Sequence, residues 1–258
     1  MNETRKKFNN SQFLIYKDLL TEEEVSALQS DFEKFKSNQL GDSLSRQKNT
    51  RFTFGQLAGS LGEIYKNEKI ISVVKDILGE NLALYFNRLM IKDPDAPDSV
   101  TPHQDMPYFH GSVNKVTVFV FLSGNHKDDG GMVFVPNSTL FGLLPRGNLN
   151  LAQLPKIPYV SPELGPRDVV FSDFFTWHWS WPQKNKMDRP IIQLAYQESS
   201  DGSWEDKFMR SPVLVSGQWK TNNFVSAKEA AAVETCNTPD AGISYEISDF
   251  LISRGEKN

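Results

Sequence analysis

Two early segments of the chain repeat their apolar residues at helical spacing. In the first, the apolar positions are Val25, Leu28, Phe32 and Phe35. They follow Thr21-Glu-Glu-Glu24, a capping box in which the first and last side chains bond each other's backbone N–H. This pattern predicts an amphipathic helix from residue 21 to about residue 37. A second apolar set, closed by Gly79, predicts a helix over residues 67–78.

The pattern becomes strand-like from about residue 82 to residue 197. Runs rich in Val, Ile, Phe and Tyr cover 82–91, 113–122, 132–135, 168–171 and 190–197. Clusters of Gly, Pro, Asp and Asn separate these runs. Helices followed by many short strands predict a mainly-β fold with flanking helices, either a β-barrel or a double-sheet core with the N-terminal helices packed outside.

These boundaries predict one domain over residues 1–258. It would comprise a helical N-terminal region of about 1–80, a β core of about 82–197 and a C-terminal extension of about 198–258. Within the extension, residues 226–235 have the pattern of a short capped helix.

Charge and cysteine content exclude several classes of protein. The 258 residues carry 28 basic and 32 acidic side chains, a net charge of −4, whereas general nucleic-acid binders need a basic surface. A single cysteine allows no internal disulfide and no Cys-rich zinc module. No apolar run approaches the roughly 20 residues that span a bilayer, and the N-terminus lacks a secretory signal pattern. We therefore expect a cytoplasmic protein without nucleic-acid or membrane partners.

The first candidate for chemistry is His103-Gln-Asp105. If this segment is a strand, the His and Asp side chains project from one face. An imidazole beside a carboxylate supplies two of the three ligands of the 2-His-1-carboxylate triad that binds non-haem Fe(II). The alternative is a histidine at a strand end that hydrogen-bonds a neighbouring aspartate.

The second candidate is the segment Trp177-His-Trp-Ser-Trp181. In a strand the three tryptophans share one face, most simply packed against helices, while His178 and Ser180 share the other. Arg189 opens the next predicted strand, and a guanidinium is the natural bidentate partner of a carboxylate. Viewed alone, Arg189 would be an ordinary surface arginine in a salt bridge.

Together these segments resemble the phytanoyl-CoA dioxygenase-like family of Fe(II)/2-oxoglutarate-dependent oxygenases. The segments that carry the resemblance are 13–20, His103-Gln-Asp105, 116–122, 130–138, 168–171, His178-x-Ser180 and Arg189. The resemblance implies a double-stranded β-helix core of the jelly-roll/cupin-like kind. It also implies that His103, Asp105 and His178 bind Fe(II), and that Ser180 and Arg189 hold the distal carboxylate of 2-oxoglutarate.

Further residues are candidates for the cosubstrate pocket. One of Asn87 and Arg88 must face inward by strand parity, and we assign Asn87 to the cosubstrate, together with Thr117 and Phe121. His110 is a possible pocket residue. His126 has the surroundings of a solvated turn.

The expected activity is that of a dioxygenase using Fe(II), 2-oxoglutarate and O2. It would oxidise, by default hydroxylate, a C–H bond of a small polar metabolite or natural-product intermediate and release succinate and CO2. Asp105 favours oxygenation, because related halogenases have a small residue in place of this carboxylate. The alternatives are a non-catalytic jelly-roll binding protein with a vestigial metal site and a cupin-type metal-dependent isomerase or hydrolase.

Overall fold

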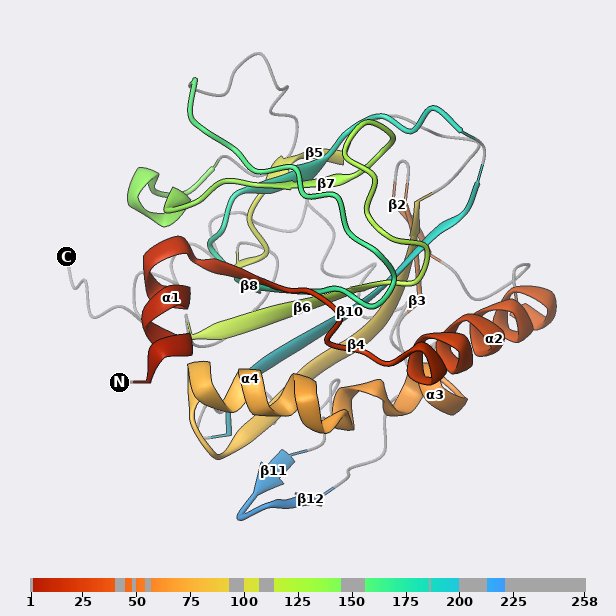
Figure 1. Cartoon of the computed structure of the whole chain (residues 1–258), viewed down its shortest axis with the longest axis horizontal. Helices are drawn as coiled ribbons and strands as arrows, with labels where there is room; N and C mark the ends of the chain where they lie inside the picture. Colours follow the sequence, from red (N-terminus) through yellow and green to blue (C-terminus); the bar gives the residue numbers. More distant parts are fainter. Residues whose placement is uncertain are drawn as a thin grey trace.

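The described part of the computed structural model forms two β-sheets and a layer of helices (Figure 1). The structure describes residues 2–39, 45–47, 50–53, 57–92, 100–106, 114–144, 156–185, 187–199 and 213–220. The predicted helix at 226–235 and His110 lie outside these residues. Within the described part of the chain, no helix is long and apolar enough to cross a membrane.

Both predicted helices are present, and the capping box forms at the N-terminus of the first of them. The α-helices are α1 (Glu3–Ser11), α2 (Glu22–Gln39), α3 (Gly59–Glu63) and α4 (Glu68–Leu78). Thr21 N–H donates to Glu24 Oε2 at 2.6 Å, and Glu24 N–H donates to Thr21 Oγ1 at 3.2 Å. The short α1 was not predicted, because Phe8 is its one buried side chain and it shows no apolar periodicity.

The large sheet is antiparallel throughout and has the order β1-β8-β6-β10-β4-β11-β12, with β3 also on β4 and β2 on β3. Its strands are β1 (Phe13–Tyr16), β2 (Ser45–Gln47), β3 (Thr50–Thr53), β4 (Leu82–Lys92), β6 (Lys115–Phe121), β8 (Val169–Asp173), β10 (Arg189–Glu198), β11 (Val213–Val215) and β12 (Gln218–Lys220). The predicted strands of the core correspond to β4, β6, β8 and β10 here and to β7 in the small sheet. The N-terminal region is not purely helical as predicted, since it contributes β1, β2 and β3 to this sheet.

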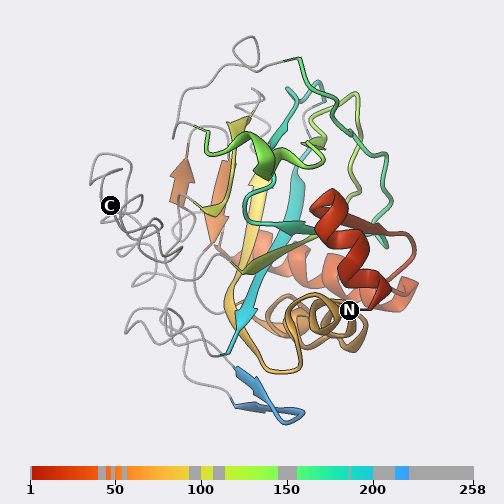
Figure 2. The same ribbon diagram turned by 90° about the vertical axis from the view of Figure 1, so that its left-hand side faces the viewer.

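The small sheet lies over one face of the large one, and the helices cover the other (Figure 1). Its order is β5-β9-β7, built from β5 (Val100–His103), β9 (His178–Ser180) and β7 (Met132–Phe134). The 3-10 turns η1 (Ile64–Lys66) and η3 (Ser138–Phe141) complete the described elements. Seen from the side, the hairpin β11–β12 extends away from the small sheet at the opposite end of the molecule (Figure 2).

The main hydrophobic core lies between the helices and the large sheet. It joins residues of α2 and α4, such as Leu28 and Val74, to alternate residues of the strands, such as Val118 and Leu194. A smaller cluster, including Phe119, lies between the two sheets. The strands therefore bury both faces, which explains their nearly continuous apolar runs.

A bulge in β4 changes which side chains face the helices. Ala195 of β10 pairs with Phe86 and Tyr196 pairs with Leu84, so that Tyr85 is an extra residue on β4. Side chains alternate between the two faces along a strand. Each residue of β4 after this insertion therefore lies on the opposite face from the one that simple alternation from Leu84 would give it.

The effect of the bulge is visible in the packing. Leu84 before the bulge and Leu89 and Ile91 after it all lie in the helix-facing core, although 84 and 89 differ in parity. Arg88 and Lys92 consequently point to the other face, toward the small sheet, where they bond Gln193 and Ser180.

Candidate metal centre

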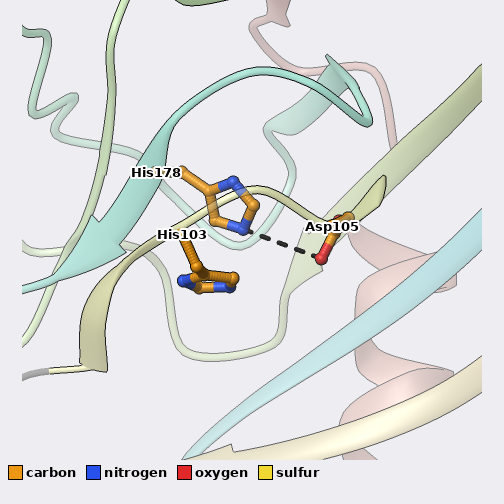
Figure 3. Close-up of side chains that lie close together, drawn as sticks. All are labelled: His103, Asp105 and His178. Carbon is orange, nitrogen blue, oxygen red and sulfur yellow. Dashed lines mark ion pairs between the residues drawn. The ribbon is translucent and has the colours of Figure 1, made fainter. Parts of the chain in front are cut away.

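Three predicted ligands meet between the two sheets. His103 ends β5 and pairs directly with His178 of β9, and the two rings lie 4.2 Å apart between centroids. Asp105 follows just beyond the end of β5. Each of the three residues offers one ligating atom, and these atoms lie within 4.8 Å of one another. Figure 3 shows the three side chains pointing toward a common point.

The route by which Asp105 reaches the site differs from the predicted one. We expected His103 and Asp105 to share one face of a continuous strand, but β5 stops at His103. The chain then turns, and Met106 N–H donates to Phe174 O at 3.1 Å. This turn brings Asp105 beside the histidines.

Backbone carbonyls set the tautomers of both histidines. Nδ1 of His103 lies 2.8 Å from Thr101 O, and Nδ1 of His178 lies 2.9 Å from Thr176 O. A carbonyl only accepts, so Nδ1 carries the proton in each neutral ring and the Nε2 lone pair is available to a metal. Such an outer hydrogen bond is the usual support of a metal-bound histidine.

The protonation state of His103 is also the one that metal binding requires. Burial, reinforced by the neighbouring His178, lowers the pKa of His103 to about 4. His103 is therefore neutral at neutral pH, and its ring can ligate without first losing a proton.

The Asp105 carboxylate has two unlike oxygens. Oδ2 accepts from Thr117 Oγ1 at 2.8 Å and from Gln193 Nε2 at 3.2 Å. Oδ1 lies 3.9 Å from His178 Nε2, the contact drawn as a dashed line in Figure 3. Asp105 is 4% exposed, and a buried carboxylate needs such partners or a cation. One oxygen is held by the protein and the other faces the histidines.

Two phenylalanine side chains lie against the ring of His178. The centroids of Phe119 and Phe134 lie 5.9 and 6.2 Å from that of His178. Phe121, predicted to contact the cosubstrate, is buried farther along the same face, 6.4 Å from Phe119 between ring centroids. Its contact with a cosubstrate remains a prediction.

The predicted carboxylate-binding residues lie together at one end of the site. Ser180 is two residues beyond His178, and Arg189 is 7% exposed with one guanidinium nitrogen 2.7 Å from Asp129 Oδ2. Burial lowers the pKa of Arg189, while the Asp129 charge opposes this shift. The pair with Asp129 orients the guanidinium within the fold.

Lys92 is a buried cation in this group that the sequence analysis missed. It pairs with Arg189 across β4 and β10, and its Nζ donates to Ser180 Oγ at 3.1 Å and to Trp181 O. In the structure the Lys92 side chain is 6% exposed. The sequence feature that could have indicated its burial is its position at the end of a long apolar strand.

Asn87, which we assigned to the cosubstrate, does not face the metal centre. Asn87 faces the helices and donates to Leu61 O at 2.9 Å. The bulge at Tyr85 places Arg88 on the site face instead, where its Nε donates to Gln193 Oε1. Thr117 does reach the site, where it bonds Asp105.

The tryptophans alternate with His178 and Ser180 as expected, but within the described residues the cluster that holds Trp177 and Trp179 contains no α-helical residue. Trp177 and Trp179 form a cluster with Val133, Val135 and Leu144 on the outer side of the small sheet. Trp177 Nε1 donates to Gly142 O at 3.1 Å. Loops cover this stripe. His126 is exposed, as predicted, and pairs with Glu163 at 2.8 Å.

Comparison with known proteins supplies a family and a fold. The family model for phytanoyl-CoA dioxygenase (PhyH) matches residues 13–190. A curated relative, the probable alpha-ketoglutarate-dependent hypophosphite dioxygenase of Stutzerimonas stutzeri, is 28% identical over 108 residues, which is 42% of this chain. The match spans only 36% of that relative's length.

Solved structures share the architecture. The epimerase SnoN of nogalamycin biosynthesis, in complex with Fe3+, alpha ketoglutarate and nogalamycin RO, is 17% identical with a TM-score of 0.65, over 77% of this chain and 83% of that one. EctD of S. alaskensis, with 2-oxoglutarate and 5-hydroxyectoine, is 18% identical with a TM-score of 0.63, over 78% and 77%. The predicted mainly-β, double-stranded β-helix fold is confirmed.

Proposed function

The chain belongs to the phytanoyl-CoA dioxygenase family, and we propose that it is an Fe(II)- and 2-oxoglutarate-dependent dioxygenase. It would use O2 to oxidise, most simply to hydroxylate, a C–H bond of a small polar metabolite or natural-product intermediate. Succinate and CO2 would be released. The observation that carries this proposal is the convergence of His103, Asp105 and His178 in a buried site with their ligating atoms directed at one another.

The donor set fits Fe(II) and leaves coordination positions for other ligands. Nε2 of both histidines and Oδ1 of Asp105 would hold the ion, since Nδ1 of each ring and Oδ2 of the carboxylate are already bonded to the protein. Bound Fe(II) with 2-oxoglutarate supplies the oxidising chemistry, coupled to decarboxylation of the cosubstrate.

Arg189, Ser180 and Lys92 would bind the distal carboxylate of 2-oxoglutarate. Two buried cations beside a hydroxyl, two residues along β9 from His178, form a suitable site for an anion that also reaches the metal. Asp129 orients Arg189 and offsets part of its charge. Phe119 and Phe134 beside His178 would keep water from the reacting centre.

The substrate is proposed as small and polar. The relative from Stutzerimonas stutzeri carries the name of a hypophosphite dioxygenase, so small oxyanions belong in the first set of compounds to be tested. Amino acids, sugars, phosphonates and natural-product intermediates complete that set.

The test is a screen for succinate release that depends on an added compound. The protein is loaded with Fe(II) and 2-oxoglutarate without O2, mixed with each compound, and exposed to air. We expect at least one compound to raise succinate release, and both omission of O2 and His103→Ala to abolish the increase. Wild-type turnover in His103→Ala would contradict the proposal. Turnover without O2 would favour the isomerase or hydrolase alternative, and failure to bind Fe(II) or consume 2-oxoglutarate the binding-protein alternative.

A further inference from the structure

Arg88 is a buried cation beside the metal centre to which the proposed function assigns no role. It is 8% exposed, and its guanidinium carbon lies 4.7 Å from the centroid of the Phe86 ring. Its Nε donates to Oε1 of Gln193, which is 1% exposed on the neighbouring strand β10. A charge at this depth must be stabilised by the groups that surround it, and the amide oxygen of Gln193 is one of these groups.

The contact with Arg88 determines how the Gln193 amide is oriented. A guanidinium has donors only, so the amide must present its oxygen to Arg88. The amide nitrogen then faces the other way, toward Asp105 Oδ2 at 3.2 Å. Arg88, Gln193 and Asp105 thus form a directed chain of hydrogen bonds in which the carboxylate is the terminal acceptor.

The chain ends on the oxygen that Thr117 also holds. Asp105 Oδ2 receives the Thr117 hydroxyl at 2.8 Å as well as the Gln193 amide. Oδ1 is turned toward His178 Nε2, 3.9 Å away. With Oδ2 occupied by two donors, the carboxylate presents one oxygen to the centre between the histidines.

We propose that Arg88 is a positioning residue that acts through Gln193 to make Asp105 a one-oxygen ligand of the metal through Oδ1. The proposal rests on the metal site of the proposed function. Without the cation, Gln193 Oε1 would be a buried acceptor with no donor, which is unfavourable. The amide would then be held only from the Asp105 side, and its donation to Asp105 Oδ2 would weaken. A charged donor also polarises the amide and strengthens its bond to the carboxylate.

Metal binding to the apoprotein tests the proposal without any turnover. Mn(II) is titrated calorimetrically into wild type, Arg88→Met, Gln193→Met and the double variant. Loss of an outer partner of a metal ligand typically weakens binding about 10–100-fold, and we expect this loss in each single variant. The double variant should be no weaker than either single one, because both substitutions break the same chain.

Two further variants separate positioning from general packing. Arg88→Lys retains a cationic donor and should recover most of the affinity. Lys115→Met is the matched control, since Lys115 is another buried cation, with its Nζ 5.1 Å from the centroid of the Tyr85 ring. This control should bind Mn(II) as the wild type does. The visible spectrum of the Co(II)-loaded protein should change in Arg88→Met and Gln193→Met and be restored in Arg88→Lys.

Three results would overturn the proposal. These are wild-type Mn(II) affinity in Arg88→Met, losses that add in the double variant, and a higher KM for 2-oxoglutarate with unchanged Mn(II) affinity, which would make Arg88 a cosubstrate ligand. Failure of the proposed function looks different. A wild type that binds Mn(II) through Asp105 but consumes no 2-oxoglutarate refutes the dioxygenase activity, whereas the expected variant pattern would still support positioning by Arg88.

Discussion

The two faces of the large sheet are built from the same strands but have different roles. Toward the helices, β6 and β10 present residues such as Val118 and Leu194, which are fully buried in the main core. Toward the small sheet, the residues next to them are Thr117 and Gln193, which bond Asp105. One face stabilises the fold through apolar burial, and the other uses its buried polar groups to arrange a metal site.

This contrast implies that substitutions on the two faces affect different measurements. Changes on the helix face should lower the free energy of unfolding and spare the metal site. Changes to Asp105, or to the groups on the site face that bond it, should lower metal affinity more than they lower the free energy of unfolding.

The largest effect is expected for Asp105→Ala. The substitution removes the one carboxylate of the triad, so Mn(II) affinity should fall by more than about 100-fold, beyond the loss typical of an outer partner. The free energy of unfolding of the apoprotein should change much less, since the desolvation cost of a buried charge is removed at the same time as its hydrogen bonds with Thr117 and Gln193 are lost. Calorimetric titration and urea denaturation measure the two quantities. A large loss of stability with intact metal binding would break the comparison.

On the opposite face, Leu194→Ala should destabilise the protein by roughly 2–5 kcal/mol, because it leaves a cavity in the main core. Urea denaturation of the apoprotein measures this change. Mn(II) affinity measured where the variant is fully folded should match the wild type. A weakened metal site would mean that the two faces are coupled through β10.

Thr117→Val tests the site face with a smaller change. It removes one of the two donors to Asp105 Oδ2 and keeps the side-chain volume, so Mn(II) affinity should fall by about tenfold. Thr117→Ser keeps the hydroxyl and serves as the control. Equal affinities for valine and serine variants would argue that Gln193 alone orients the carboxylate.

The smallest effect concerns a polar contact among the helices. Asp31 of α2 accepts from the backbone N–H and the hydroxyl of Ser60 in α3, and from Lys34. These bonds, led by that of Lys34, lower the pKa of Asp31 from 3.8 to about 2.

Since the fold favours the ionised form of Asp31, its contribution to stability is complete above pH 4 and is lost as the pH falls toward 2. Solvent screening limits that contribution to the order of 1 kcal/mol. Asp31→Asn should remove this part of the acid destabilisation, measured by urea denaturation at several pH values, and should leave Mn(II) affinity at neutral pH unchanged. An unaltered pH dependence in Asp31→Asn would show that Asp31 does not stabilise the helix layer.

Local patterns predicted α2, α4 and the core strands, because helix capping and strand alternation depend on residues that are neighbours in the chain. The capping box at Thr21 is present in the structure, and the long apolar runs of the core are strands. The strands β1 to β3 escaped prediction because each is short. β1 and β3 owe their places to pairing with the distant strands β8 and β4, and β2 joins the sheet only through β3.

Some residues of the metal site could be predicted from local patterns, and others could not. His103, Asp105 and His178 could be found from motifs and their order along the chain. Gln193, Lys92 and Arg88 could not, because their roles depend on contacts between strands far apart in sequence. Gln193 and Asp105, for example, are 88 residues apart.

The sequence by itself determined the two longest helices, α2 and α4, the core strands and the identity of the three metal-binding candidates. Only the tertiary structure decided between Asn87 and Arg88. The reason is the bulge at Tyr85, which forms where β4 pairs with β10 and reverses the parity of the residues that follow. Such a register shift is a property of two strands together, and neither strand's own pattern of apolar residues encodes it.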